Sequence, residues 1–372
     1  MSVEAAIHRR DYSLTGPEFT RAEERGLVNA DWYLSPIDRK DLKTLTRRRN
    51  GPAIRDTVIW LSGLVVLGYL AVVTFPSWWS IPIFVAYGTL FCAATSRWHE
   101  CGHGTAFATS WMNTAVYQLS SCMLFMLATR WRYSHIEHHS DTIIVGRDPE
   151  IHQPRPPIMR QIWLQIIDIP GVMALGPSIF QYAFGRVPQG DLTFLPKSEV
   201  KKACWEARIY LVVYALVIVS CFVMWTPLPI LLFGLPALFG MPFYWACSLT
   251  QHLGMYEDVL DHRLNARTVI MGPVGRFLYW NMNFHIEHHM FPMVPYHALP
   301  RLHKMIGGDL PTPTPSLTAA VKEVIGALNR QRTEPDYVID RPLQEGAGPY
   351  RYGPSSMPHP GDDRGRVVEL DS

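Results

Sequence analysis

Four uncharged apolar blocks alternate with polar stretches along the chain and predict four membrane-spanning helices. The blocks cover residues 58–75, 81–96, 209–225 and 228–249, and none contains Asp, Glu, Lys or Arg. A helix needs roughly 20 apolar residues to cross a bilayer. The links within each pair of blocks, PSWWS and TPLP, are uncharged, whereas the other flanks are basic. This asymmetry places both termini on the cytoplasmic side, in the inner membrane if the cell is bacterial.

Polar segments before and after these blocks divide the rest of the chain. Residues 1–50 form a cytoplasmic N-terminal segment that lacks the apolar core of a signal peptide and ends in the basic run RKDLKTLTRRRN. Because this run abuts an apolar block, and the net charge is only +2, a membrane flank is a better interpretation than a nucleic-acid patch. Residues 51–311 form the membrane domain, 312–341 a helical segment with a helix from Ser316 to Gln331, and 342–372 a disordered tail.

Two shorter segments carry apolar residues without the pattern of a span. Residues 114–128 are interrupted by polar side chains, which predicts a helix that dips into the membrane or lies along it. Residues 161–184 are broken by Asp, Pro and Gly, which predicts a pair of interfacial helices. The six cysteines show no CxxC pair and no regular spacing, so we expect reduced thiols and no disulfide framework.

Three histidine clusters lie at the predicted cytoplasmic face. SHIEHHSD and NFHIEHHMFP share the pattern HxxHH, which 15 randomly placed histidines would produce on the order of 0.02 times per chain. On a helix, the spacing i, i+3, i+4 puts three imidazoles on one face, within reach of a common ion. The third cluster is HECGHGTAF, at the end of the second predicted span. The eight histidines of the clusters are His99, His103, His135, His138, His139, His285, His288 and His289.

This number of histidines predicts two metal ions. A usual zinc site has three or four protein ligands, and neutral imidazole suits Fe, Zn, Cu and Ni alike. Redox-inactive zinc would need no such array, whereas a dinuclear iron site that handles O₂ would. A metal transporter is a remote alternative, because transport sites place ionisable residues near the bilayer midplane and the four apolar blocks contain no charged side chain.

HECGH, HIEHH and NFHIEHHMFP resemble the three histidine boxes of the membrane fatty acid desaturase superfamily, the acyl-lipid desaturase branch in particular. The resemblance covers roughly Leu45 to Lys304. It implies an all-α integral membrane fold, in which four transmembrane helices carry a cytoplasmic helical cap with a histidine-rich di-metal site. It also implies a non-haem di-iron centre that activates O₂ to attack an unactivated C–H bond. A further ligand is expected after the last span, where QHLG supplies His252; a hydrogen-bonded interfacial histidine is the alternative.

Several carboxylates near the boxes are candidates to orient the histidines by accepting the distal N–H of a ring. An exposed cytoplasmic carboxylate is the alternative interpretation for each. The candidates are Glu100, Glu137, Asp148, Glu150 and Glu287. The stretch LNARTV places Asn265, Arg267 and Thr268 where they could contact substrate or an electron donor. The histidines expected not to be ligands are His8, His152, His262, His297, His303 and His359.

Electrons are expected to come from a separate protein. The sequence has no Gly-rich dinucleotide loop, and PHPGD at His359 is followed by too few residues for a cytochrome b5 domain. A ferredoxin or rubredoxin with its reductase would suit the basic cytoplasmic face. The ligand set does not decide the product. We favour a fatty acyl desaturase acting on a membrane lipid, with a hydroxylase or an O- or N-demethylating monooxygenase, like the rhizopine oxygenases, as the alternative.

Overall fold

The computed structural model describes residues 10–151, 153–167 and 169–351. Within these ranges the predicted all-helical class is confirmed, since the only β pairing consists of three isolated bridges. His8, His152 and His359 lie outside the described residues. The helices are α1 (Pro17–Glu24), α2 (Arg39–Leu45), α3 (Asn50–Thr74), α4 (Ser80–Cys92), α5 (Ala94–Gly102), α6 (Ser110–Met123), α7 (Ala128–Ser140), α8 (Met159–Leu164), α9 (Ile169–Ala183), α10 (Lys197–Val223), α11 (Pro236–His252), α12 (His262–Asn265), α13 (Pro273–Leu278), α14 (His285–Met290), α15 (Leu299–Ile306) and α16 (Leu317–Arg330).

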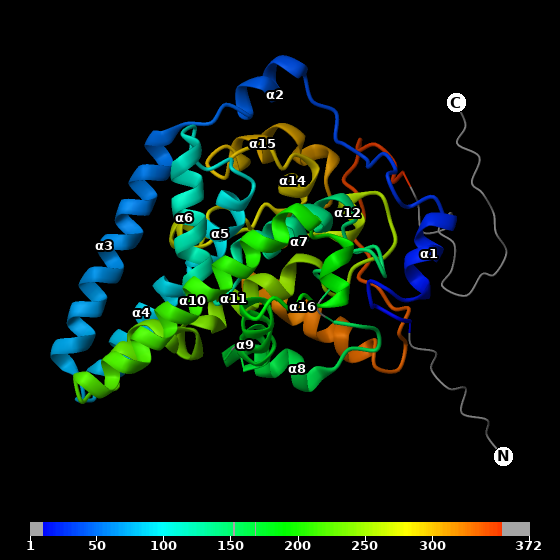
Figure 1. Ribbon diagram of the computed structural model, residues 1–372. Helices are drawn as coiled ribbons and strands as arrows, with labels where there is room; N and C mark the ends of the chain where they lie inside the picture. Colours follow the sequence, from blue (N-terminus) through cyan, green and yellow to red (C-terminus); the bar gives the residue numbers. More distant parts are fainter. Residues whose placement is uncertain (1–9, 152, 168, 352–372) are drawn as a thin grey trace.

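Three helical stretches are long and apolar enough to cross a membrane: Arg39–Thr74, Lys197–Val223 and Ile230–His252. In the most apolar window of each, only 17%, 17% and 22% of the residues are buried. Contiguous exposed apolar surface of this extent is unfavourable in water and is typical of a lipid-facing surface. In Figure 1, α3 and α10 both extend toward the lower left, away from the short helices α12 and α14.

The second predicted span, residues 81–96, is not one helix in the structure. Helix α4 ends at Cys92, and α5 begins at Ala94 after a break at Ala93. With 13 residues, α4 is shorter than the roughly 20 residues that a span requires. The difference arises because hydropathy detects the apolar block but carries no signal for the break.

Two glycines allow α4 and α11 to pack backbone against backbone. A Cβ atom on Gly240 would lie 2.0 Å from the carbonyl carbon of Gly88, and a Cβ on Gly88 would lie 2.6 Å from the carbonyl oxygen of Pro236. Small residues at such crossings are a common device of helix pairs in membranes. The Tyr87 hydroxyl also donates to the Leu232 carbonyl at 2.7 Å. This crossing fixes α4 and α11 relative to each other, and therefore His99, which follows α4, relative to His252, the last residue of α11.

Tryptophans cluster in the short links that follow α3 and α10. Trp78 and Trp79 are 86% and 77% exposed, and Trp225 is 93% exposed. Tryptophan is enriched at membrane–water interfaces, where one part of the ring contacts lipid and the N–H contacts water. The sequence assigns these links to the outer interface, and the exposure of their tryptophans fits that assignment.

The segments near the two ends of the described chain pack on the histidine-bearing helices. Trp32 stacks on His262 of α12 with ring centroids 4.2 Å apart. The buried Arg263 donates to the carbonyl oxygens of Gly348 and Pro349, each at 2.9 Å. The tail predicted to be disordered from residue 342 therefore makes specific contacts up to residue 351, and residues 352–372 lie outside the described residues. Helix α16 begins at its N-cap Ser316, where the sequence predicts a helix.

Candidate metal centre

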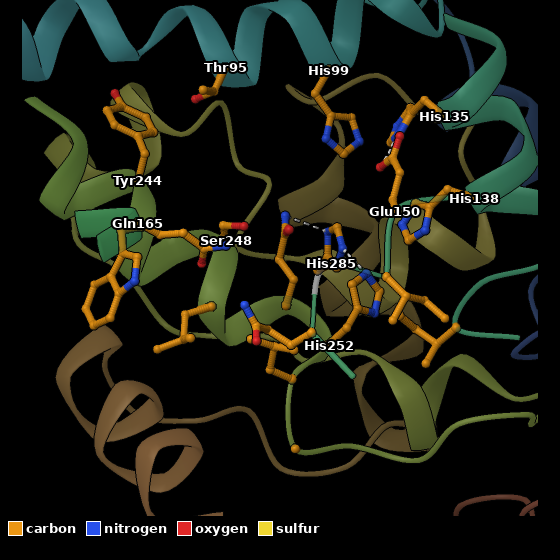
Figure 2. Close-up of a pocket in the computed structure, with 18 of the residues that line it drawn as sticks. Thr95, His99, His135, His138, Glu150, Gln165, Tyr244, Ser248, His252 and His285 are labelled. Atoms are coloured by element: carbon orange, nitrogen blue, oxygen red, sulfur yellow. Dashed lines mark hydrogen bonds and ion pairs between the residues drawn. The ribbon is translucent and has the colours of Figure 1, made fainter. Parts of the chain in front are cut away.

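Nine histidines gather in two adjacent groups. In each group, one ligand atom per residue lies within 4.8 Å of those of the others. The first group consists of His99, His103, His135, His139 and His288, and the second of His138, His252, His285 and His289. Figure 2 shows rings from several elements pointing toward one space, with His99 and His135 at the top and His252 and His285 below. The structure thus brings together every histidine that the sequence proposes as a metal ligand.

The rings reach the centre from the ends of four helical elements. His99 lies in the last turn of α5 and His103 directly follows it, while α7 and α14 each carry one HxxHH triplet. His252 is the last residue of α11. Arg97, which is fully buried, anchors α5 by donating to the carbonyl oxygens of Phe277 and Leu278 at 3.2 and 2.6 Å. The centre therefore depends on contacts between segments far apart in sequence.

Each HxxHH triplet is divided between the two groups, which differs from the prediction of one common ion per triplet. In α7, His135 and His139 belong to the first group and His138 to the second. In α14, His285 and His289 belong to the second group and His288 to the first. Helix geometry explains the division. At about 100° per residue, positions i and i+4 lie about 40° apart, whereas i+3 and i+4 lie about 100° apart. The i, i+4 pair therefore shares one ion position, and the i+3 ring points to the other.

The spacing of the ring nitrogens fits a metal ion in each group. In the first group, the Nε2 atoms of His99 and His288 are 2.7 Å apart. In the second, the Nε2 atoms of His252 and His285 are 2.8 Å apart, and those of His285 and His289 are 3.1 Å apart. Two ligands at right angles around an ion at about 2.1 Å would lie about 3.0 Å apart. Such close lone pairs repel each other unless a proton or a cation lies between them.

Hydrogen bonds at the opposite ring nitrogen hold several of these imidazoles. His138 Nδ1 lies 2.8 Å from Asp148 Oδ2, and His135 Nδ1 lies 3.2 Å from Glu150 Oε2. His252 Nδ1 donates to the backbone carbonyl of Asn265 at 2.7 Å. A ring that donates from Nδ1 presents the Nε2 lone pair to the centre, which is the arrangement of metal-binding histidines.

Burial favours the neutral, metal-binding form of most of these rings. Burial, assisted by neighbouring imidazoles, lowers the pKa of each of the following well below 6.5: His103, His139, His285, His288 and His289. His138 is the exception. Burial lowers its pKa, but the adjacent Asp148 carboxylate outweighs this and raises the pKa to about 9. An ion at Nε2 of His138 would replace the proton and would keep the favourable interaction with Asp148.

The other predicted carboxylates do not contact a ring of the two groups. Glu287 is fully buried, accepts from Thr268 Oγ1 at 2.5 Å and is hydrogen-bonded to His303. Glu100 accepts from Thr105 Oγ1 at 2.6 Å and from the Tyr296 amide at 3.0 Å. The remaining one, Glu137, faces Arg147 at 3.6 Å, and its side chain is 29% exposed. These three therefore brace the helices around the centre, whereas Asp148 and Glu150 hold its rings.

The residues of the LNARTV stretch are packed beside the centre and do not face its cavity. The buried Asn265 side chain donates to the Thr142 carbonyl at 3.0 Å. Arg267 is 1% exposed and pairs with Glu323 at 2.8 Å. Neither residue, nor Thr268, lines the cavity described below. The prediction that this stretch contacts substrate is therefore not supported.

Two contacts to the rings carry no signal in the sequence. Thr142 Oγ1 lies 3.2 Å from His289 Nδ1, and Gln251 Nε2 lies 3.5 Å from His285 Nδ1. Thr142 and His289 are 147 residues apart, so no local pattern could pair them. His262, which belongs to neither group, lies between Trp32 and His289, with its ring centroid 5.1 Å from that of His289.

A cavity of about 370 Å³ opens beside the two groups. One wall follows α11 from Met241 through Tyr244 and Ser248 to His252. Figure 2 shows Tyr244 and Ser248 toward one end and His135, with Glu150, toward the other. The apolar part of the lining includes Trp98, Met126, Trp131, Met241, Trp245 and Leu249. The cavity therefore has room for an elongated, mainly apolar ligand that passes the histidines.

The fold and the site define an all-helical protein with helices of membrane-spanning length and a two-part histidine centre. The profile of the family described as "Fatty acid desaturase" matches residues 76–319. This chain belongs to that family.

Relatives of known name are similar at modest identity. A probable fatty acid desaturase of Sorghum bicolor is 27% identical over 269 residues, which cover 64% of this chain and 66% of the relative. A chloroplastic omega-3 fatty acid desaturase of Ricinus communis is 24% identical and covers 87% of this chain and 72% of its own. An sn-1 acyl-lipid omega-3 desaturase (ferredoxin) of Synechocystis is 24% identical, with 73% and 76% covered. This chain thus spans about two thirds to three quarters of the length of these relatives.

Proposed function

We propose that the protein is a membrane-bound di-iron desaturase that introduces a double bond into the acyl chain of a lipid. The observation that carries the proposal is the pair of histidine groups, five and four rings, beside an elongated cavity at the ends of apolar helices. The relatives are named for desaturation. Their names favour this reaction over hydroxylation or demethylation.

Four spans support the centre in this proposal. They are α3, α4 continued by the start of α5, α10, and α11 with the π-helical turn Ile230–Gly234 before it. The close contact of Gly88 and Gly240 favours α4 as the partner of α11 within the bilayer. The basic run before α3 favours a cytoplasmic location for both termini and for the helical cap with its histidines.

Iron is the metal that suits this donor set and this chemistry. Imidazole binds several transition metals, but an oxidation that uses O₂ requires a redox-active one. When bound, two iron ions would take up electrons from the donor and supply the O₂ reactivity needed to attack an unactivated C–H bond. The first group would hold one ion and the second the other, with His252 as a ligand of the second.

The protein itself orients the histidine rings and the acyl chain and shields the reacting position from water. Asp148 and Glu150 hold the rings of His138 and His135 in place, and the apolar wall along α11 aligns the acyl chain. Six of the nine histidines are buried, which helps to keep bulk water from the reacting position. Overall, the acyl chain loses two hydrogens, a donor supplies two electrons with two protons, and O₂ becomes two waters. Relatives named with ferredoxin support a ferredoxin as donor.

Metal analysis and product analysis of the purified protein test the proposal. We expect two iron ions per chain and, with reduced ferredoxin, its reductase and membrane lipids, acyl products that have lost two hydrogens by mass spectrometry. His285→Ala should abolish the product while the protein still inserts into the membrane. One zinc ion per chain without iron would overturn the proposal, and products that gain oxygen would assign the chain to hydroxylation.

A further inference from the structure

The lining of the cavity has a polar part that the removal of hydrogen from an acyl chain does not require. It consists of Gln153, Arg155, Glu257 and Gln331, contributed by the segments after α7 and α11 and by the end of α16. Along α11 the lining runs from Met241 to His252 and then continues to Gly254 and Glu257. The cavity therefore offers a ligand polar side chains near the end of α11 as well as the apolar wall along this helix.

Gln153 is the unusual member of this polar part. The residue is only 4% exposed, and among the described residues neither its Oε1 nor its Nε2 has a hydrogen-bond partner. A buried amide without partners is costly, and native proteins retain few of them. Since Gln153 lines the cavity, a ligand in the cavity can supply the missing partners. The Nε2 of the amide can donate to the carbonyl oxygen of an uncharged group such as an ester, and its Oε1 can accept from a hydroxyl group.

The charges around Gln153 disfavour an anionic ligand group. Arg155 is engaged, because its Nε pairs with Glu257 Oε1 at 2.9 Å and its guanidinium donates to the Met255 carbonyl. Glu257 also accepts from the Tyr12 hydroxyl at 3.0 Å. Glu257 also pairs with Arg10 at 3.4 Å. Arg155 is the only arginine or lysine among the described residues that line the cavity. A carboxylate or a phosphate beside Gln153 would therefore meet an arginine whose charge is already neutralised by Glu257.

We infer that Gln153 binds the uncharged ester group that joins the acyl chain to its lipid and so selects esterified chains over free fatty acid anions. The inference rests on the proposed function, because it assumes an acyl chain in the cavity. It assigns Gln153 as a specificity residue and the Arg155–Glu257 pair as the charge barrier. The ester would be held at Gln153, with the hydrocarbon along the apolar wall of α11.

Ligand binding measured without turnover tests this inference. The probes are methyl oleate, sodium oleate and 1-octadecene, added in detergent micelles to the full-length, metal-loaded protein and followed by quenching of the tryptophan fluorescence from the cavity wall. The wild-type protein should bind methyl oleate more tightly than oleate. Gln153→Leu should weaken the binding of methyl oleate about tenfold, which corresponds to about 1.4 kcal/mol. It should leave the binding of 1-octadecene unchanged. Gln161→Leu, at an exposed glutamine of α8, is the matched control.

Two further variants keep the test decisive. Gln153→Met retains the length of the side chain and should weaken the binding of methyl oleate as Gln153→Leu does. Agreement between the two variants guards against misfolding of either one. Glu257→Gln removes one negative charge and should strengthen the binding of oleate severalfold relative to that of methyl oleate. Unchanged binding of methyl oleate in both Gln153 variants, or a wild-type preference for oleate, would overturn the inference. Because no turnover is needed, absence of a desaturated product would count against the proposed function alone.

Discussion

At the scale of single residues, the two HxxHH triplets show which part of a metal site is encoded locally. Their repetition identifies His135, His138, His285 and their neighbours as candidates without any structure, because such spacing is rare by chance. The partners of the rings are encoded unevenly. Asp148 lies near α7 in sequence and can be anticipated, whereas the role of Thr142 beside His289 depends on the packing of α7 against α14. Glu287 looks similar to Asp148 in sequence, yet the structure directs it to His303 and Thr268.

Asp148→Asn should weaken metal binding in the second group. The substitution keeps the shape of the side chain. It removes the negative charge that holds the His138 ring in place and raises the pKa of that ring. Loss of such an outer partner typically lowers metal affinity by about 10- to 100-fold. Titration of the purified protein with a chelator, followed by metal analysis, should show one of two ions released at a lower chelator concentration.

Asp336→Asn provides the control for this titration, because Asp336 is exposed and distant in sequence from the centre. It should release both ions as the wild-type protein does. If Asp148→Asn kept both ions at wild-type chelator concentrations, Asp148 would have no role in holding His138 for the metal.

At the scale of helices, hydropathy predicts the apolar blocks but not their continuity. The blocks 58–75, 209–225 and 228–249 lie, apart from one or two residues at an end, within helical stretches of spanning length, because uninterrupted apolar composition favours a helix in lipid. The block 81–96 divides at Ala93 instead, where α4 ends and α5 turns toward the histidine centre. The segment 161–184 does form two helices, α8 and α9, with a short 3-10 turn between them. The contacts of Arg97 in α5 with the carbonyl oxygens of Phe277 and Leu278 join segments far apart in sequence, and hydropathy carries no signal for them.

Gly240→Ala should destabilise the α4–α11 pair. The new Cβ would overlap the backbone at Gly88, and relief requires the helices to separate, which typically costs about 1–3 kcal/mol for overpacked sites. We expect a lower midpoint of thermal aggregation in detergent and a faster loss of bound metal on heating, since α11 carries His252. Gly326→Ala in α16 is the control, because nothing lies within 4 Å of its added Cβ. A midpoint equal to that of the wild-type protein would argue against a tight crossing.

At the scale of the whole molecule, the distribution of exposed side chains defines two ends that differ in chemistry. One end carries the exposed Trp78, Trp79 and Trp225 in uncharged links. The other carries the basic run of residues 39–49 and the helices that hold the histidines. The charge asymmetry predicts the placement of these ends relative to the membrane, whereas the contacts of Gly348 and Pro349 with Arg263 could not be predicted. The composition of the tail suggests disorder, and contacts with distant residues such as Arg263, Gly307 and Asp309 hold this part of it.

Labelling of single cysteines from each side of the membrane tests this placement. Trp78→Cys and Trp225→Cys should react with a membrane-impermeant maleimide in intact cells, whereas Asp41→Cys and Lys322→Cys should react only in inverted vesicles. The native cysteines are buried or half-buried, so the wild-type protein measures the background. Reaction of Trp78→Cys and Asp41→Cys from the same side would mean that α3 does not cross the membrane, and the four-span arrangement would fail. Reaction of the link cysteines only in inverted vesicles would reverse the orientation and place the histidines outside the cell, where cytoplasmic ferredoxin could not reduce them.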